Sequence, residues 1–284
     1  MQIIHSVEQL KDVVESFKHQ GKSVGLVPTM GALHKGHASL VSKCRAENDC
    51  AVVSVFVNPT QFNNKTDFAT YPHELDKDVA LLESLSVDVL FAPQPEDVYT
   101  ENEMNETFSF DFQGLDKVME GKQRPGHFNG VVQIVSKLFS FVEPDRAYFG
   151  EKDFQQVAII KLMVRSMNFK TEIVQCPIIR EESGLAASSR NQLLSVEERE
   201  IAANIYRVLK ESVNFATSKS PAELTQWTIE NINAVNGLEV EYYEIVDGNT
   251  LQKVSSWDDA GYIVGCVTVH CGRVRLIDNI KLKG

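Results

Sequence analysis

Residues 50–57 read CAVVSVFV, a run that is almost entirely apolar and rich in valine. Such a run is typical of a strand that is covered on both faces, as in a parallel sheet, and Asn58-Pro59 ends it. On its N-terminal side, Val24 to Val27 predicts a shorter strand, and a helical pattern begins at about Gly36. This strand, helix and strand together predict a parallel sheet.

The same alternation extends over the first 176 residues. A helix is expected to begin after Ser6, which has Gln9 three residues later as in a capping box, and to end at Gly21. The further elements expected here are helices over 79–85, 131–142 and 154–167 and strands over 87–92 and 147–149. Alternating strands and helices predict a doubly wound α/β sheet, whose ligands bind at the carboxyl ends of its strands.

The pattern changes at about Pro177. A polar turn is followed by two helices, one capped by Ser195 with Glu198 and one opened by Ser220-Pro221. The last part predicts an antiparallel sheet with strands over 238–246, 262–269 and 274–277. We therefore expect two domains, residues 1–176 and a smaller α+β domain over residues 177–284.

Composition excludes several classes of protein. The 284 residues carry a formal charge of -11, which argues against a protein that coats nucleic acid or an anionic membrane. No apolar window is long enough for a membrane span and the N-terminus lacks the layout of a secretory signal, so a cytoplasmic protein is expected. The five cysteines are scattered without a C-x-x-C pair, and we expect buried thiols rather than metal ligands or disulfides.

The first strand leads into PTMGALHKGH, residues 28–37. His34 and His37 are three residues apart at a helix start, so both rings can lie on one face beside the backbone N–H groups, and Gly36 lets a bulky group approach. This pattern predicts an anion site. Two surface histidines or a zinc pair are alternatives, but the Glu of H-E-x-x-H and further ligands at zinc spacing are missing.

A second polar segment, NPTQF at residues 58–62, follows the second strand. It is expected to face the same crevice and to contact a substrate, although an ordinary strand-ending turn would also contain Asn-Pro. The loop over 62–72 is long for an α/β connection, which suggests a lid.

Three more segments carry polar side chains suited to a ligand. In GEKDFQQ, residues 150–156, Lys152 could meet a phosphate, although this segment taken alone favours a charged helix cap. In the turn at 188–191, SSRN, two hydroxyls and a guanidinium suit phosphate oxygens. RPGHFNG, residues 124–130, offers an Arg and a His but also fits an ordinary loop before a helix.

Taken together, PTMGALHKGH, FVNPTQF, RPGHFNG, YFGEKDFQQ, ASSRN and RLIDN resemble the pantothenate synthetase (pantoate–β-alanine ligase) family in order and spacing over essentially the whole chain. The resemblance implies a nucleotidylyltransferase-like Rossmann domain, a C-terminal domain that covers the nucleotide site, a homodimer and a cytoplasmic role in pantothenate biosynthesis. It implies that ATP, pantoate and β-alanine give pantothenate, AMP and pyrophosphate, with Mg²⁺ and through a pantoyl adenylate.

The resemblance also implies residue roles. The ATP-binding residues would be Pro28, Thr29, Met30, Gly31, Ala32, Leu33, His34, Lys35, Gly36, His37, Gly150, Glu151, Lys152, Asp153, Ile179, Ala187, Ser188, Ser189 and Arg190. His37 matches the proton donor, and His34, Lys152 and Arg190 would complete the catalytic set. Gln61 and Gln156 match the pantoate-binding glutamines, and Gln61 also matches a β-alanine contact. No protein ligand of Mg²⁺ is assigned.

This chain departs from the family pattern at two places, Tyr71-Pro72-His73 in place of YPR and Ala187 in place of a Leu or Met. Two other functions remain open at this stage. A nucleotidyltransferase acting on a phosphate would favour cations where this chain has Gln61 and Gln156. A regulatory nucleotide-binding protein without turnover would lack at least one of the residues that face the phosphates. This chain has all four of them, His34, His37, Lys152 and Arg190.

Overall fold

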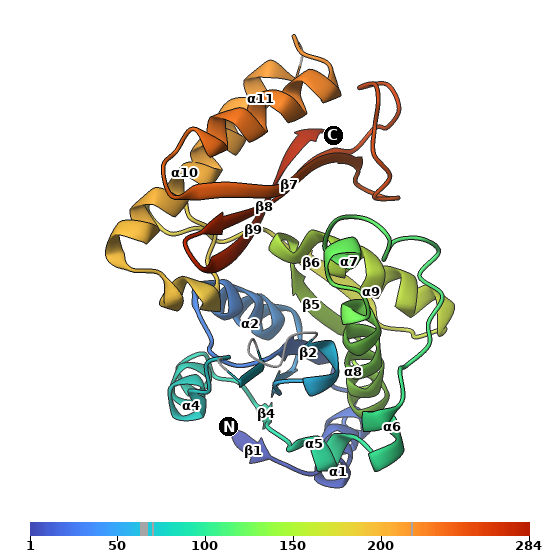
Figure 1. Ribbon diagram of the computed structural model, residues 1–284. Coiled ribbons are helices and arrows are strands. Elements are labelled where there is room, and N and C mark those ends of the chain that lie inside the picture. Colours follow the sequence, from blue (N-terminus) through green and yellow to red (C-terminus); the bar gives the residue numbers. More distant parts are fainter. Residues whose placement is uncertain (63–67, 70, 217) are drawn as a thin grey trace. The chain divides into compact units, whose positions relative to one another are not determined.

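The computed structural model describes residues 1–62, 68–69, 71–216 and 218–284 (Figure 1). The described chain forms two compact units. The first contains Met1–Asp116, Gly121–Glu151 and Gln156–Pro177, and the second contains Ile178–Gly284 with two short segments, Lys117–Glu120 and Lys152–Gln155. Two short stretches from earlier in the chain therefore belong to the same unit as its C-terminal part.

The first unit is built on a six-stranded parallel sheet in the order β1-β4-β3-β2-β5-β6. Its strands are β1 (Gln2–Ile4), β2 (Val24–Thr29), β3 (Cys50–Val55), β4 (Val89–Phe91), β5 (Arg146–Gly150) and β6 (Glu172–Cys176). The four strands predicted from apolar runs are confirmed as β2, β3, β4 and β5. The prediction missed β1 and β6. β1 has three residues, and β6, at the end of the sheet beside β5, includes half-buried and exposed polar side chains rather than an apolar run.

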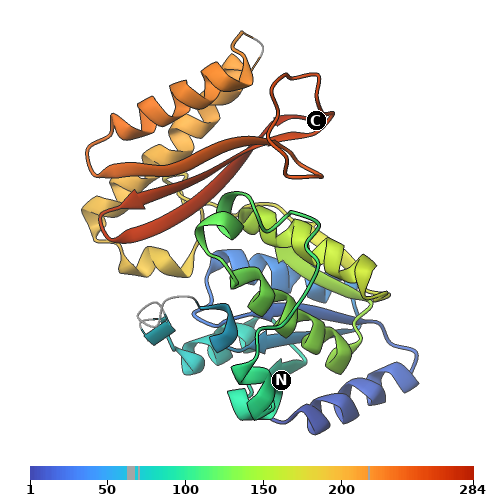
Figure 2. The same cartoon turned by 45° about the vertical axis from the view of Figure 1, so that its right-hand side comes forward.

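Helices cover both faces of this sheet (Figures 1 and 2). One buried cluster joins side chains of α1 and α8 to the sheet, and another joins side chains of α2 and α4 to its opposite face. The helices are α1 (Val7–His19), α2 (Lys35–Glu47), α4 (Leu75–Ser84), α5 (Pro95–Val98), α6 (Glu101–Asn105), α7 (Met119–Gln123), α8 (His127–Val142) and α9 (Phe154–Ser166). The first two residues of α7 and of α9 belong to the second unit. The doubly wound α/β architecture is therefore confirmed, while the short helices α5, α6 and α7 were not predicted.

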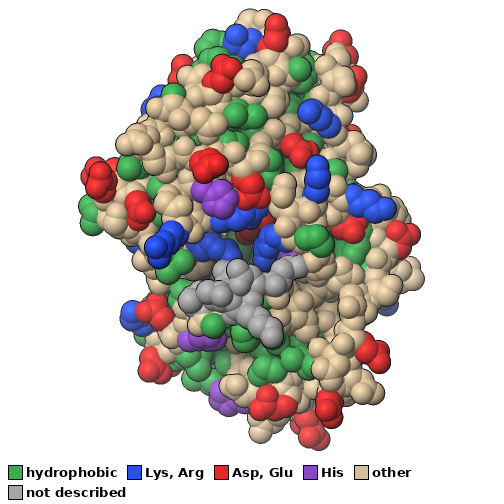
Figure 3. Space-filling view, viewed as in Figure 1, with side chains coloured by type: hydrophobic (Ala, Val, Ile, Leu, Met, Phe, Trp, Pro, Cys, Tyr) green, Lys and Arg blue, Asp and Glu red, His purple; other side chains and the backbone are tan. Residues whose placement is uncertain are grey.

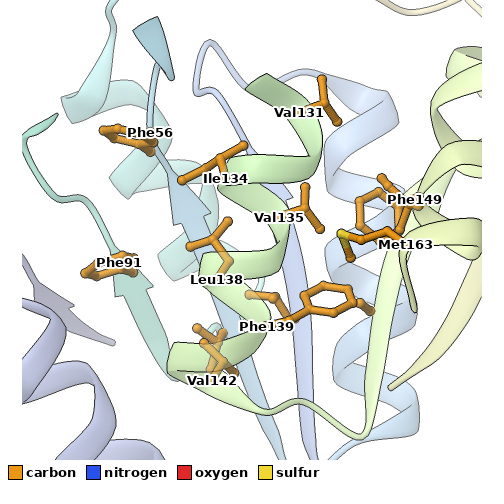
Figure 4. Close-up of a cluster of buried hydrophobic side chains, with 14 of the residues drawn as sticks. Phe56, Phe91, Val131, Ile134, Val135, Leu138, Phe139, Val142, Phe149 and Met163 are labelled. Carbon is orange, nitrogen blue, oxygen red and sulfur yellow. The ribbon is translucent and has the colours of Figure 1, made fainter. Parts of the chain in front are cut away.

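Helix α8 anchors the core of the first unit. Its residues Val131, Ile134, Val135, Leu138, Phe139 and Val142 recur at intervals of three and four, and all are buried. Figure 4 shows these side chains turned toward Phe56, Phe91 and Phe149 of the sheet side and toward Met163 of α9. Because α8 is apolar over most of its surface, it fixes the position of the residues that precede it.

The order of the strands determines where a ligand can bind in the first unit. The chain passes from β2 to the neighbouring β3 on one side, and β5 later pairs with β2 on the other side. This reversal beside β2 is a topological switch point, where open α/β sheets bind ligands outside the carboxyl ends of their strands. Residues 28–37, 58–62 and Gly150 lie at these ends.

The second unit is a three-stranded antiparallel sheet with two helices. Its strands are β7 (Leu238–Asp247), β8 (Ile263–Cys271) and β9 (Val274–Lys283), and its helices are α10 (Val196–Ser212) and α11 (Pro221–Asn233). Both helices lie on the same face of the sheet, where they share one buried apolar cluster with it (Figure 2). The antiparallel strands and the capping boxes at Ser195 and Ser220 are confirmed.

The cysteines are buried thiols, as the sequence predicts. All five cysteines are free and buried, and burial raises the pKa of the Cys44 thiol to about 12.

Figure 3 shows acidic side chains spread over the visible surface of each unit among basic ones, rather than gathered in one patch. In the described part of the chain, no helix combines the length and the apolar character that crossing a membrane requires.

A polar cluster joins Glu120 of α7 to the sheet of the second unit. Arg275 donates from Nη1 to Glu120 Oε2 and from Nη2 to Glu120 Oε1, both at 2.7 Å. Tyr242 and Thr268 donate to the same carboxylate at 2.8 and 3.0 Å. Burial raises the pKa of Glu120, but the hydrogen bonds and the charge of Arg275, with the two hydroxyls, outweigh it and lower the pKa to about 2.

This lowered pKa makes the stability of the second unit depend on pH. A carboxyl whose pKa is lower in the folded chain stabilises it above its ordinary pKa of 4.5, and this contribution is lost as the pH falls from there toward about 2. We expect Glu120→Gln to remove this part of the pH dependence. Urea unfolding followed by tryptophan fluorescence measures it, because Trp227 and Trp257 both lie in the second unit. Glu239→Gln, exposed on β7, is the control and should keep the wild-type profile.

Candidate active site

The loop after β2 is held by hydrogen bonds to its backbone. Thr29 Oγ1 donates to Ser54 O at 2.7 Å, and the Gly31 N–H donates to Thr29 Oγ1 at 3.2 Å. Gly31 and Ala32 then have φ values of 82° and 49°, in the left-handed region. This conformation is unfavourable for alanine, so interactions from outside the loop must stabilise it.

Asp78 on α4 supplies that stabilisation. Its carboxylate accepts the N–H of Ala32 at 2.9 Å and the N–H of Leu33 at 2.7 Å, and the side chain is buried. Burial raises the pKa of Asp78, while the two backbone N–H groups act in the opposite direction. No local pattern indicates this role, because Asp78 is one of several acids near the start of α4 and lies 46 residues from Ala32.

His34 and His37 form an imidazole capping box at the start of α2. His34 Nδ1 accepts the Gly36 N–H at 3.1 Å, and His37 Nδ1 accepts the His34 N–H at 3.4 Å. The ring centroids are 4.0 Å apart, so the rings share one face as the spacing predicts. Two of the backbone N–H groups expected beside the anion are thus bonded to the rings. Since each Nδ1 is an acceptor, the neutral rings carry their hydrogen on Nε2.

The segment after β3 lies against the loop after β2. Gln61 is buried, and its Nε2 lies 2.7 Å from the Sδ atom of Met30. Asn58, also buried, donates from Nδ2 to Gly130 O at 3.0 Å and accepts at Oδ1 from Tyr99 OH at 2.8 Å. The structure therefore brings Gln61 and the Pro28–His37 loop together, within the first unit.

The RPGHFNG segment supports the 58–61 turn. His127 Nδ1 lies 2.8 Å from Gln61 O, and Arg124 Nη1 lies 3.2 Å from His127 Nε2. Because arginine can only donate, Nε2 accepts and Nδ1 carries the hydrogen that goes to Gln61 O. A Cβ at Gly130 would lie 2.5 Å from the carbonyl carbon and oxygen of Thr60. Sequence reasoning left this segment as either a ligand site or an ordinary loop and missed its structural role.

The segment after β5 is divided between the two units. Glu151, in the first unit, accepts a hydrogen bond at Oε1 from Gln175 Nε2 at 3.1 Å, and Gln156 is half-buried near the start of α9. Lys152, in the second unit, is half-buried, and its carbonyl oxygen accepts from Asn279 Nδ2 at 3.1 Å. Asp153 is exposed.

Ile179 and residues 187–190 belong to one turn of the second unit. The Ala187 N–H donates to Ile179 O at 2.9 Å, and Arg180 pairs with Ala186 in an antiparallel bridge. Ser188 caps the short helix η3 (Ser189–Leu193) by accepting the Arg190 N–H at 3.3 Å. The sequence-predicted residues of this unit are thus Lys152, Asp153, Ile179 and the 187–190 turn.

Two other expectations concern the loop and a metal. The lid hypothesis for residues 62–72 falls largely on 63–67 and 70, which lie outside the described residues. Among residues 1–62, 68–69, 71–216 and 218–284, no group of three or more His, Cys, Asp or Glu side chains could hold a metal ion.

The family model described as pantoate-beta-alanine ligase matches residues 2–281 of this chain. The chain belongs to the pantoate–β-alanine ligase family. Among the relatives of this family, the pantothenate synthetase of Bacteroides thetaiotaomicron is 59% identical over 283 residues, covering 100% of this chain and 99% of the relative. That of Porphyromonas gingivalis W83 is 54% identical and covers 99% of each chain.

Solved structures of pantoate–β-alanine ligases are similar over the whole chain. The pantothenate synthetase of Thermus thermophilus has a TM-score of 0.92 and 42% identity, and the match covers 100% of both chains. The ligase of Francisella tularensis, complexed with β-γ ATP and β-alanine, has a TM-score of 0.83 and 40% identity over 99% of this chain and 98% of that one. As a member of this family the chain is an enzyme, a ligase, rather than a regulatory protein without turnover.

The role of Asp78 can be tested with Asp78→Asn. The amide would place an NH₂ group against one of the two backbone N–H donors, and a buried donor without an acceptor costs about 1–3 kcal/mol. We expect a loss of about that size in the free energy of unfolding, together with weaker binding of an ATP analogue. Asp76→Asn, exposed on the same helix, is the control. Equal ATP affinity in both variants would contradict the role of Asp78 in holding the loop.

The contact of Gly130 predicts a second effect. In Gly130→Ala the new methyl group meets backbone rather than a flexible side chain, so the 58–61 turn has to shift. We expect the variant to fold. Its KM for pantoate should rise, because the family resemblance assigns Gln61 of this turn to pantoate, and its KM for ATP should change less. Steady-state kinetics measure both constants. Gly114→Ala has open space around its Cβ but a left-handed φ of 87°, and it shows what backbone strain alone does in this unit.

Proposed function

We propose that this protein joins pantoate to β-alanine with the consumption of ATP, giving pantothenate, AMP and pyrophosphate through a pantoyl adenylate. The observation that carries the proposal is the meeting of two loops in the first unit. The amide of Gln61, after β3, lies against Met30 in the loop that leads to the paired imidazoles of His34 and His37. A neutral group for an acid and donors for a phosphate thus occur at one edge of the sheet.

The chemistry requires activation of a carboxylate before an amide can form. A carboxylate oxygen of pantoate attacks the α-phosphorus of ATP, the bond to the bridging oxygen breaks, and pyrophosphate leaves. The amine of β-alanine then attacks the acyl carbon of the adenylate and expels AMP. Because the acyl group is carried on AMP, no nucleophilic side chain of the protein is needed.

The imidazoles suit the first step. Negative charge grows on phosphoryl oxygens as pyrophosphate leaves, and fixed donors directed at those oxygens lower the barrier. The capping box fixes both rings with the hydrogen on Nε2, which is the tautomer that can donate from Nε2 to a phosphate oxygen. We assign His37 as the proton donor and His34 as its partner on the phosphates.

Lys152 and Arg190 are the proposed cations for the same triphosphate. An ammonium acts as a point charge, whereas a guanidinium can hold two phosphate oxygens at once. The proposed ATP-binding set begins with residues 28–37. Besides Lys152 and Arg190, it also contains Gly150, Glu151, Asp153, Ile179, Ala187, Ser188 and Ser189. The family resemblance and the fixed backbone of the 179–190 turn support this assignment.

Gln61 and Gln156 are proposed to hold pantoate, and Gln61 also to contact β-alanine. Amide groups can bind hydroxyls and a carboxylate without a full positive charge, which leaves the attacking oxygen nucleophilic. A nucleotidyltransferase that acts on a phosphate would instead need cations here. Gln61 is buried and its backbone carbonyl is held by His127, so its side-chain amide is kept in place.

Mg²⁺ is proposed to enter with the nucleotide. Mg²⁺ that binds with a nucleotide usually keeps several of its waters, so it would need few protein ligands. The buried carboxylate of Asp78 is used by two backbone N–H groups, and we assign it no metal. When bound, the ion would neutralise phosphate charge.

The remaining parts of the proposal rest on the family resemblance. Residues 1–176 would bind ATP and pantoate, and residues 177–284 would cover the nucleotide. The protein would act in the cytoplasm as a homodimer.

Replacement of a phosphate donor tests the proposal directly. Removing one donor of this kind typically costs about 2.7–4 kcal/mol in the transition state, which is a factor of about 10²–10³. We expect His37→Ala and Lys152→Ala each to lower pantoate-dependent pyrophosphate release by two or more orders of magnitude while the fold is retained. His19→Ala and Lys170→Ala, both exposed, are the matched controls. Near-normal release in either active-site variant would refute its role.

One assay separates the proposed reaction from the alternatives. ATP, Mg²⁺ and pantoate are supplied first and ATP–pyrophosphate exchange is followed, and β-alanine is then added and AMP is followed. Pantoate-dependent exchange supports the ligase. Transfer of a nucleotidyl group to a phosphate acceptor would support a nucleotidyltransferase, and binding without turnover would support a regulator.

A further inference from the structure

The RLIDN motif, residues 275–279, has no role in the reaction described above. It lies on β9 of the second unit, and its last two residues, Asp278 and Asn279, are both buried. Buried polar side chains need partners, because an unpaired one costs free energy. The partners of these two side chains lie in the two segments of this unit that carry Lys152 and Arg190.

Asp278 holds the hairpin that leads to Arg190. Arg180 donates to its carboxylate from Nη1 at 2.7 Å and from Nη2 at 2.9 Å, a bidentate ion pair. The same guanidinium donates to Gly184 O at 3.2 Å and lies 3.6 Å from the centre of the Tyr206 ring. Four contacts on one planar group leave little freedom to the 180–186 hairpin.

The hairpin passes this rigidity on to the 187–191 turn. Asn191 is buried and donates from Nδ2 to Ala186 O at 3.1 Å and to Glu181 Oε1 at 2.8 Å. Arg190 lies between Ala187, bonded to Ile179, and Asn191, bonded to the hairpin. The backbone of Arg190 is therefore tied through the hairpin to Asp278.

Asn279 holds the other cation segment. Its Nδ2 donates to the carbonyl oxygen of Lys152 at 3.1 Å, and its own N–H donates to Asp278 Oδ1 at 2.8 Å. Lys152 and Arg190 are 38 positions apart in the chain, but both segments are attached to neighbouring residues of β9. Consecutive Cα atoms are about 3.8 Å apart, so the two attachments leave β9 at neighbouring positions.

We propose that Asp278 and Asn279 are positioning residues that hold Lys152 and Arg190 at the separation required by one triphosphate. The inference rests on the proposed function, since it gives the two cations a shared ligand. Donors that are fixed before the reaction stabilise the transition state without a cost of reorganisation, and a misplacement of about 1 Å can cost about 10² in rate.

The two attachments differ in how cleanly they can be tested. Asp278→Asn leaves the half-buried Arg180 charge without its full partner, which can destabilise the whole unit. Asn279→Ala removes a neutral hydrogen bond to a carbonyl, and such a bond contributes only about 1 kcal/mol to stability. Asn279→Ala is therefore the main variant, and Asp278→Asn is the second.

The matched control is Glu241→Gln. Glu241 accepts hydrogen bonds from Arg275, which is also on β9, and neither residue contacts the hairpin or Lys152 through a described hydrogen bond. This variant weakens a polar contact of the same sheet without touching either cation segment. It should lose stability but keep the exchange activity of the wild type.

The test measures pantoate-dependent ATP–pyrophosphate exchange, the Kd of a non-hydrolysable ATP analogue and the unfolding temperature. We expect Asn279→Ala to lower kcat for exchange by about 10- to 100-fold, to weaken the binding of the ATP analogue, and to leave the KM for pantoate unchanged. Its unfolding temperature should match that of Glu241→Gln. A kcat and a Kd equal to those of the control would overturn the inference.

Failure of the proposed function gives a different result. In that case the wild type shows no pantoate-dependent exchange. The Kd of the ATP analogue is then the measurement that tests whether Asp278 and Asn279 position the two cations. Weaker binding in both Asn279→Ala and Asp278→Asn, relative to Glu241→Gln, would still support positioning of the two cations for a triphosphate. Unchanged binding would overturn it.

Discussion

The rest of the first unit depends on the pairing of β2 with strands on both of its sides. Parallel hydrogen bonding aligns Val24–Thr29 with Cys50–Val55, and β5 lies along the other edge of β2. Because parallel strands end at the same edge of a sheet, the segments after β2, β3 and β5 have to emerge there. Helix α8, buried over several turns, holds the sheet from one face and makes this edge a fixed platform.

Loops on such a platform need further support, and buried polar groups provide it here. Asp78 accepts two N–H groups of the loop after β2, and Asn58 and His127 hold the turn that carries Gln61. Burying these groups is unfavourable unless every hydrogen bond is made, so each bond favours a single loop conformation. The polar contacts that offset the cost of burial also hold the two loops that carry the imidazoles and the amide.

The second unit uses ion pairs and a strand for a similar purpose. Glu120 of α7 is bound to β9 through Arg275, and Arg180 and the carbonyl of Lys152 are bound to later residues of the same strand. Segments that are distant in sequence are thus fixed on β9, which explains why Lys117–Glu120 and Lys152–Gln155 belong to this unit. A strand with alternating side-chain directions can serve several attachments without losing its place in the sheet.

The sequence by itself determined the apolar strands β2 to β5, the antiparallel C-terminal sheet, the paired rings of His34 and His37 and the motifs of the family, because strand and helix periodicity, caps and motif spacing are local properties. Only the tertiary structure decided the edge strands β1 and β6, the bonding of Asp78 to Ala32, the support of Gln61 by His127 and the attachment of Lys152 to Asn279. The last three of these contacts join residues 46 to 127 positions apart, and no local pattern records which distant partner a polar side chain will find.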